Sequence, residues 1–139
     1  MPHLIDEVQP YTDGGCRGNP GPGAVGMIIM AGDERELFAG AERIGHVTNN
    51  RAEYRALFKG LDLCAAYTRR RVVCYSDNEL LINQMTGAYR LKNVELRALW
   101  QRVKDLERVF QEVRYQQVRR TNQLLTKADR LLNQAFDRQ

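Results

Sequence analysis

Four acidic residues stand at positions where their neighbours predict burial. They are Asp13, Glu53, Asp77 and Asp129. Asp13 ends or interrupts an apolar stretch just before a segment rich in glycine and proline, and Asp77 follows the short apolar run VVCYS. Burying one ionised carboxylate without a partner costs several kcal/mol, and four together raise one another's pKa. A cluster of these residues therefore requires a counter-charge.

Helical spacing places two of the acids on apolar helix faces. Glu53 begins a row spaced i, i+3, i+4, i+7 and i+11, whose other members are Ala56, Leu57, Gly60 and Cys64. Asp129 shares a helix side with Leu125, Leu132 and Phe136. Because such rows pack against a neighbouring layer, we expect both carboxylates to point inward.

Divalent metal is the simplest counter-charge for such a cluster. Carboxylate oxygens are the ligands that Mg²⁺ prefers, and a shared acidic site can hold two ions about 3.5–4 Å apart. The alternative is that individual acids form salt bridges with Arg51, Arg55 or Arg130. A salt bridge explains one buried acid as well as a metal does, but it does not explain four together, so we favour the metal site.

Residue patterns predict nine elements in the order β-β-β-α-β-α-α-β-α. The predicted strands are 4–13, 24–30, 35–44, 72–76 and 113–118, and the predicted helices are 48–67, 78–85, 94–113 and 125–136. Pro10 weakens the first strand because it lacks a ladder donor, and 18–23 is predicted as a turn. Antiparallel strands followed by α/β crossovers indicate an α/β fold, with a mixed sheet flanked by helices.

Length and composition predict one cytoplasmic domain. The 139 residues fit a single domain, 1–139. No apolar run approaches the ~20 residues that cross a bilayer, and the N-terminus lacks a signal-peptide pattern. Three cysteines without a CxxC pair fit a reducing compartment. The net charge of +4 is a mild indication of a polyanionic partner, and we expect a monomer.

Four segments of the chain resemble the type 1 ribonuclease H family. They are YTDGGCRGNPGPG (11–23), TNNRAEY (48–54), YSDNELLINQM (75–85) and KADRLLNQA (127–135), in the family's order and covering nearly the whole chain. The resemblance implies the ribonuclease H-like fold, which has a five-stranded mixed sheet of three antiparallel strands and then two parallel ones. It also implies that the first and fourth strands lie side by side.

The same resemblance implies a chemistry. It makes Asp13, Glu53, Asp77 and Asp129 the catalytic and metal-binding residues for two Mg²⁺ ions, or Mn²⁺ in their place. The implied substrate is an RNA/DNA hybrid, whose RNA strand is hydrolysed. In a two-metal site one ion activates a water and the other stabilises the departing 3′ oxygen.

Further residues are expected at the substrate by resemblance. Cys16, Asn19, Asn49 and Asn50 would lie along the minor groove of the hybrid, where asparagine amides bind the 2′-OH group that separates RNA from DNA. The segment that begins at Gly14 would bring main chain close to the RNA strand. Helix capping explains Asn49 or Asn50 equally well, and simple packing explains Cys16.

The chain departs from the family pattern in three places. Glu79 stands where the family usually has a groove-facing glutamine. Arg119 and Arg120 resemble the arginine that a histidine-free subgroup carries before the last helix, but the spacing to Asp129 is longer here. A short connector, TGAYRLKN (86–93), replaces the basic helix that longer members insert to grip the DNA strand.

Three functions remain open at this point. The leading hypothesis is a metal-dependent endonuclease acting on RNA/DNA hybrids. A non-catalytic hybrid-binding module is the second, but a pure binder gains nothing from concentrated negative charge beside phosphates. The third is another nuclease of the same fold, such as a junction resolvase or a transposase-like domain, which cleavage of an all-DNA junction would reveal.

Overall fold

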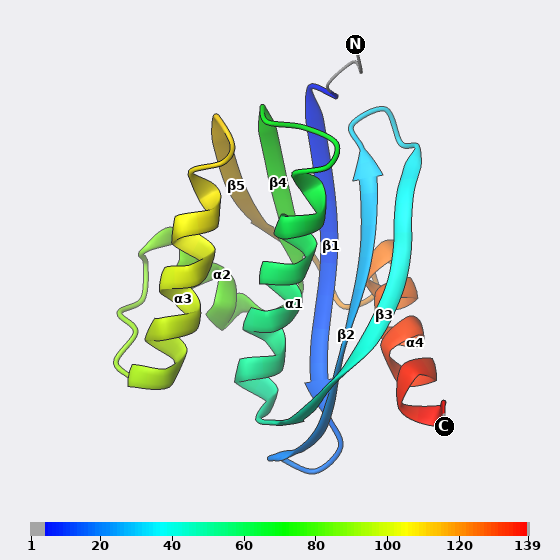
Figure 1. Cartoon of the computed structure of the whole chain (residues 1–139), viewed down its shortest axis with the longest axis vertical. Helices are drawn as coiled ribbons and strands as arrows, with labels where there is room; N and C mark the ends of the chain where they lie inside the picture. Colours follow the sequence, from blue (N-terminus) through cyan, green and yellow to red (C-terminus); the bar gives the residue numbers. More distant parts are fainter. Residues whose placement is uncertain (1–4, 139) are drawn as a thin grey trace.

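The structure is a computed structural model that describes residues 5–138, in which nine helices and strands follow the predicted order (Figure 1). The strands are β1 Glu7–Cys16, β2 Gly21–Ala31, β3 Glu36–Val47, β4 Arg71–Ser76 and β5 Glu112–Gln117. The helices are α1 Asn49–Cys64, α2 Glu79–Thr86, α3 Val94–Glu107 and α4 Gln123–Asp137. Each helix begins after a side chain that accepts a backbone N–H bond, namely Thr48, Asn78, Asn93 and Asn122.

The five strands form one sheet in the order β3-β2-β1-β4-β5. The pairs β1–β2 and β2–β3 are antiparallel, whereas β1–β4 and β4–β5 are parallel. The predicted α/β class, the mixed sheet and the adjacency of the first and fourth strands are therefore confirmed.

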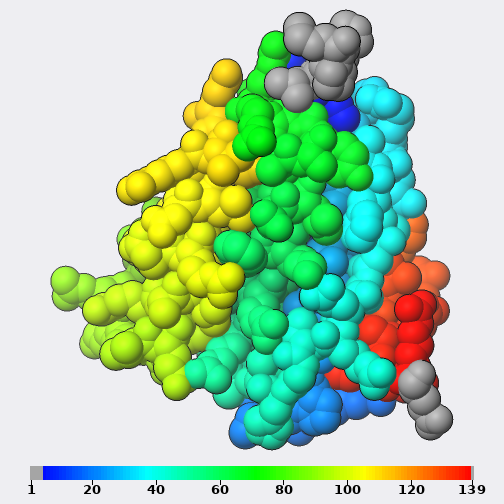
Figure 2. All heavy atoms as spheres, viewed as in Figure 1, coloured from blue at the N-terminus to red at the C-terminus, as the bar shows by residue number. Residues whose placement is uncertain are grey.

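Helices cover both faces of this sheet. In Figure 1, α1 and α3 lie on the near face and α4 lies behind β2 and β3. The main core fills the space between α1, α3 and the sheet, with Leu57, Leu61 and Val72 almost fully buried. Two smaller apolar clusters lie under α4. Figure 2 shows α1 and α3 side by side on the near face, with the connector 86–93 projecting at one edge.

The structure corrects several predicted boundaries. Segment 21–23 is not part of a turn, because it pairs with residues 45–47 of β3, and Gly23 also pairs with Cys16 of β1. The hairpin turn is thereby reduced to 17–20, and Asp13 lies within β1 rather than at its end. Helix α3 ends at Glu107, six residues before the predicted limit of 113, because 112–117 are paired with β4. Residue 4 of the first predicted strand lies outside the described residues.

Pro10 occupies a central strand, and the ladder explains how it is tolerated. β1 pairs with β4 at Val8 and again at Tyr11, but the two residues between them have no partner in β4. The missing donor of proline therefore falls in a gap of the parallel ladder.

Within residues 5–138, no helix combines the length and apolar character needed to cross a bilayer.

Candidate active site

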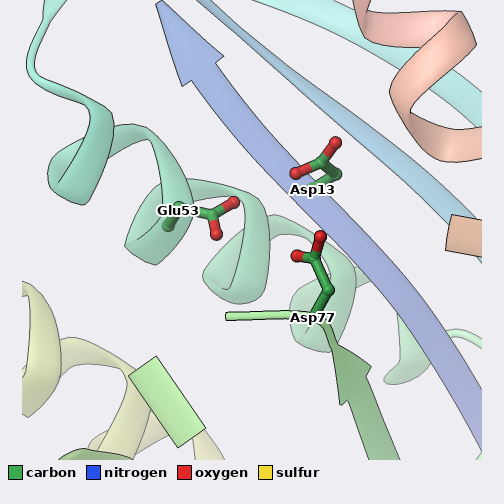
Figure 3. Close-up of side chains that lie close together, drawn as sticks. All are labelled: Asp13, Glu53 and Asp77. Carbon is green, nitrogen blue, oxygen red and sulfur yellow. The ribbon is translucent and has the colours of Figure 1, made fainter. Parts of the chain in front are cut away.

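Three of the four predicted carboxylates converge at one point. Asp13, Glu53 and Asp77 each offer an oxygen, and these oxygens lie within 4.8 Å of one another (Figure 3). Tyr11 and Tyr75 are partners in the parallel pairing of β1 and β4, so the residues two positions further along each strand share a level and a face. This register brings Asp13 and Asp77 together.

Glu53 reaches the cluster because α1 packs against β1 without an intervening side chain. A Cβ atom on Gly14 would lie 2.2 Å from the carbonyl oxygen of Ala52, so only glycine permits this approach. The Gly14 backbone N–H donates to Glu53 Oε1 over 2.6 Å, and Asn78 Nδ2 donates to Glu53 Oε2 over 2.8 Å. Both carboxylate oxygens of Glu53, a residue that is only 9% exposed, are thus held in place.

Asp129 joins the cluster from the opposite face of the sheet. Gly26 is the partner of Asp13 in the β1–β2 pairing, and a Cβ atom on it would lie 2.2 Å from the carbonyl oxygen of Ala128. The first turns of α4 therefore lie directly against β2. Asp129, the next residue, lies close enough for its carboxyl group to raise the pKa of Asp13, although it is outside the tight group of three.

Burial and crowding raise the pKa values of two of these acids. Desolvation, then the charge of Glu53, the contact with Asp129 and the charge of Asp77 raise the pKa of Asp13 to about 9. Burial raises the pKa of Glu53 to about 7, against the lowering effect of the bonds from Asn78 and Gly14. The cluster therefore resists becoming fully ionised without added positive charge.

The salt-bridge explanation for these acids does not apply. Within residues 5–138 none of the four carboxylates takes part in an ion pair with lysine or arginine. Arg51 pairs instead with Glu95, and Arg55 donates to the carbonyl oxygen of Ile44. A set of crowded, unpaired carboxylate oxygens fits hard divalent cations such as Mg²⁺ or Mn²⁺.

The cluster lies in an open groove with a volume of about 480 Å³. Five of the eight residues predicted at the substrate line it, namely Gly14, Cys16, Asn49, Asn50 and Arg120. Asn19, Glu79 and Arg119 do not. Asn19 instead accepts the Asn49 backbone N–H over 3.0 Å, and Glu79 is exposed in the first turn of α2, where the helix dipole favours an acid.

Two local interpretations need revision. The glycine at position 14 serves contact with α1, whereas Gly15 is the open position, since a Cβ atom there would meet only Asn49 Oδ1 at 4.0 Å. Thr48, not Asn49 or Asn50, caps α1. Asn49 Oδ1 accepts hydrogen bonds from the Cys16 backbone N–H (3.0 Å) and from Cys16 Sγ (3.2 Å).

Sequence reasoning missed some of the groove. Asn78 orients Glu53 while its Oδ1 caps α2 through the Leu81 N–H, and an asparagine before a helical run could have indicated the cap. Arg17 and Phe136 also line the groove. Nothing in the spacing of these two residues indicates that they meet.

Comparison with known proteins places the chain in a family. A protein-family model described as reverse transcriptase-like matches residues 11–132. Ribonuclease HI of Halobacterium salinarum is 37% identical over 138 residues, which is 99% of this chain and 68% of that protein. A bifunctional protein of Mycobacterium tuberculosis is 36% identical over 127 residues, or 91% of this chain, but the chain spans only 34% of its length.

Solved structures agree in fold over nearly the whole chain. The crystal structure of RNase H1 from Halobacterium salinarum has a TM-score of 0.90 at 36% identity and covers 94% of this chain and 98% of that one. LC11-RNase H1 in complex with an RNA/DNA hybrid has a TM-score of 0.86 at 32% identity, covering 94% and 96%. Since the family model spans most of the chain and the archaeal relative is matched over two thirds of its length, the chain belongs to the reverse transcriptase-like family and, within it, to the ribonuclease HI proteins.

Proposed function

We propose that this chain is an endoribonuclease that hydrolyses the RNA strand of RNA/DNA hybrids with the help of divalent cations. The observation that carries the proposal is a group of three unpaired carboxylates with oxygens within 4.8 Å of one another, open to a groove. Support comes from relatives named ribonuclease HI and RNase H1, one of which was solved with a hybrid. A binder without chemistry has no use for such a cluster beside phosphates.

The proposed metal ligands are Asp13, Glu53, Asp77 and Asp129. Cations bound there would supply activation of a water nucleophile and neutralise charge on the departing 3′ oxygen. Asp13 is the best candidate to serve two ions, because it lies in the group with Glu53 and Asp77 and its pKa also responds to Asp129. Gly14 and Asn78 position Glu53 by their hydrogen bonds, and no covalent nucleophile is required.

We further propose that asparagines in the groove identify the RNA strand. Both Asn49 and Asn50 are exposed and line the groove. Asn49 Oδ1 is occupied by Cys16, and among residues 5–138 the Nδ2 group of Asn49 and the side chain of Asn50 have no hydrogen-bond partner. These amides are therefore available to a 2′-OH group, while Asn19 supports the Asn49 backbone.

For the loop before α4, Arg120 is the proposed backbone contact, since it lines the groove. Contacts of Glu79 and Arg119 with substrate remain predictions.

We also propose Mg²⁺ as the working ion, a single monomeric domain and a cytoplasmic location. The all-oxygen donor set supports Mg²⁺, and the free cysteines Cys16, Cys64 and Cys74 support a reducing compartment.

One assay tests the proposal directly. Purified protein is incubated with RNA/DNA hybrid, duplex RNA, duplex DNA or a DNA junction, in Mg²⁺, Mn²⁺ or a chelator. We expect cleavage of the hybrid's RNA strand alone and only with metal. Asp77→Asn should reduce the rate about a hundredfold or more, whereas Asp62→Asn, at an exposed position of α1, should not. Hybrid binding without cleavage, or full activity of Asp77→Asn, contradicts the proposal.

A further inference from the structure

An arginine in the β1–β2 turn faces the same groove and has no assigned role. The Arg17 guanidinium carbon lies 4.5 Å from the ring centroid of Phe136. Its Nη2 donates to Asp137 Oδ1 over 3.0 Å. Both partners come from the C-terminal turn of α4, so Arg17 joins the hairpin turn to the last helix. Arg17 and Phe136 both line the groove.

The bond to Asp137 leaves most of this guanidinium unused. Arginine carries five N–H donors in one plane, and within residues 5–138 only Nη2 has an acceptor. The two side chains of the ion pair are 52% and 68% exposed, and an exposed pair of this kind contributes little to stability. Asp137 therefore holds Arg17 weakly and can be displaced by a stronger anion.

Stacking on Phe136 orients the Arg17 guanidinium so that it can bind an anion. Stacking on a ring uses the flat face of the group and leaves its N–H edge open. The backbone N–H of Arg17 also donates to the Pro22 carbonyl oxygen over 2.9 Å, which fixes the base of the side chain. A pre-oriented guanidinium edge suits a phosphate, because two of its N–H groups can bind two phosphate oxygens at once.

The charges that line the groove indicate what Arg17 would bind. Four carboxylates line the groove, and Arg17 and Arg120 are its lining cations within the described residues. A nucleic-acid backbone entering it needs positive contacts away from the metal site. Arg17 is four residues beyond Asp13 along the chain, a reach of up to about 13 Å, so it would meet a different phosphate from the one that is cleaved.

We propose that Arg17 binds a backbone phosphate of the hybrid outside the cleavage site, and that Asp137 competes with this phosphate for the same guanidinium. The inference rests on the proposed function, because it takes the hybrid as substrate. The contact between Arg17 and Asp137 would then lower the affinity for substrate slightly, rather than stabilise the fold. The two roles predict opposite effects when Asp137 loses its charge.

Hybrid binding is measured in the Asp77→Asn background, so that the RNA strand stays intact, over a series of salt concentrations. Arg17→Ala should weaken binding about fivefold at low salt and reduce the slope of log K against log salt by about 0.9, the value for one phosphate contact. Asp137→Asn should tighten binding about twofold. The double variant should behave like Arg17→Ala, since Asp137 acts only through Arg17.

Arg35→Ala is the matched control. Arg35 also forms an exposed pair with an acid, Asp33, but it lies at the β2–β3 turn, at the other end of the sheet from Arg17 (Figure 1). Its removal deletes the same charge and should leave the salt slope unchanged. A matching loss of slope in Arg35→Ala would mean that net charge, not a local contact, is being measured, and would overturn the inference.

Two further outcomes would overturn it. One is an unchanged salt slope in Arg17→Ala. The other is weaker binding in Asp137→Asn together with a lower melting temperature, which is expected if the contact stabilises the fold. Failure of the proposed function looks different, because wild-type protein would then bind the hybrid with an Arg17-dependent slope and yet leave it uncleaved.

Discussion

Asp13 on β1 lies directly opposite Gly26 on β2, and the backbone of α4 rests on that glycine. This single pairing places Asp129, which follows the contacting residue Ala128, beside Asp13. The position of the Asp129 carboxylate therefore depends on the absence of a side chain at Gly26, although β2 itself carries none of the four acids.

Gly26→Ala should both destabilise the protein and impair cleavage. Its Cβ would lie 2.2 Å from a backbone oxygen, so α4 must shift, at a cost of about 1–3 kcal/mol in unfolding free energy. The shift moves Asp129, and we expect the cleavage rate to fall more than about tenfold. Urea unfolding and single-turnover cleavage measure the two effects. Gly15→Ala, whose Cβ has no atom closer than 4.0 Å, should keep wild-type stability, and equal destabilisation of both variants would contradict this account.

Metal-free protein should lose stability as the pH rises. The pKa of Asp13 is raised to about 9 and that of Glu53 to about 7 in the folded state, whereas both are near 4 in an unfolded chain. Between these values the folded state binds more protons than the unfolded state, so the unfolding free energy decreases with pH. The stabilisation is complete below about pH 4 and is lost as the pH passes through about 7 and then 9.

Urea unfolding from pH 5 to 9 in a chelator tests this dependence. Asp13→Asn should flatten the upper part of the curve, because it removes the group with the higher pKa, and Asp62→Asn should follow the wild type. Added Mg²⁺ should reduce the loss at high pH, since a cation replaces the proton. A chelated wild type that becomes more stable towards pH 9 would be incompatible with the crowded cluster.

Asn78→Ala should separate helix capping from catalysis. Asn78 caps α2 through the Leu81 N–H at 3.0 Å and also donates to Glu53. Asn93 caps α3 through the Leu96 N–H at the same 3.0 Å distance and is not among the residues that line the groove. Both alanine variants should lose about 1 kcal/mol of stability, but only Asn78→Ala should lose activity, by about tenfold or more. Equal activity in the two variants would show that the bond to Glu53 is dispensable.

Asn50→Asp should weaken recognition of RNA. The change removes the amide donors and adds a negative charge in a groove that already contains four carboxylates. We expect hybrid affinity to fall about fivefold or more and the preference for hybrid over duplex DNA to shrink. Binding of both duplexes is measured side by side. Gln111→Glu, an equal change of charge at an exposed residue just before β5, should leave the preference intact, so a similar effect there would point to net charge alone.

The sequence by itself determined the order of elements and the identity of the acids. Short apolar runs separated by turn residues indicated the strands, and the rows that contain Glu53 and Asp129 indicated helix faces that meet a sheet. Both signals are local, because they depend on periods of two and 3.6 residues. Boundaries were less accurate where pairing overrides local preference, as in segment 21–23, whose composition predicts a turn but which pairs as a strand with residues 45–47.

Only the tertiary structure decided which of these residues meet. The register at Tyr11 and Tyr75 brings Asp77 to Asp13, and the close approaches at Gly14 and Gly26 bring in Glu53 and Asp129. It also separated the predicted substrate residues, with Arg120 at the groove and Arg119 outside its lining. The contact between Arg17 and Asp137 joins residues 120 positions apart. Such relations depend on how layers pack and strands align, which no short-range pattern encodes.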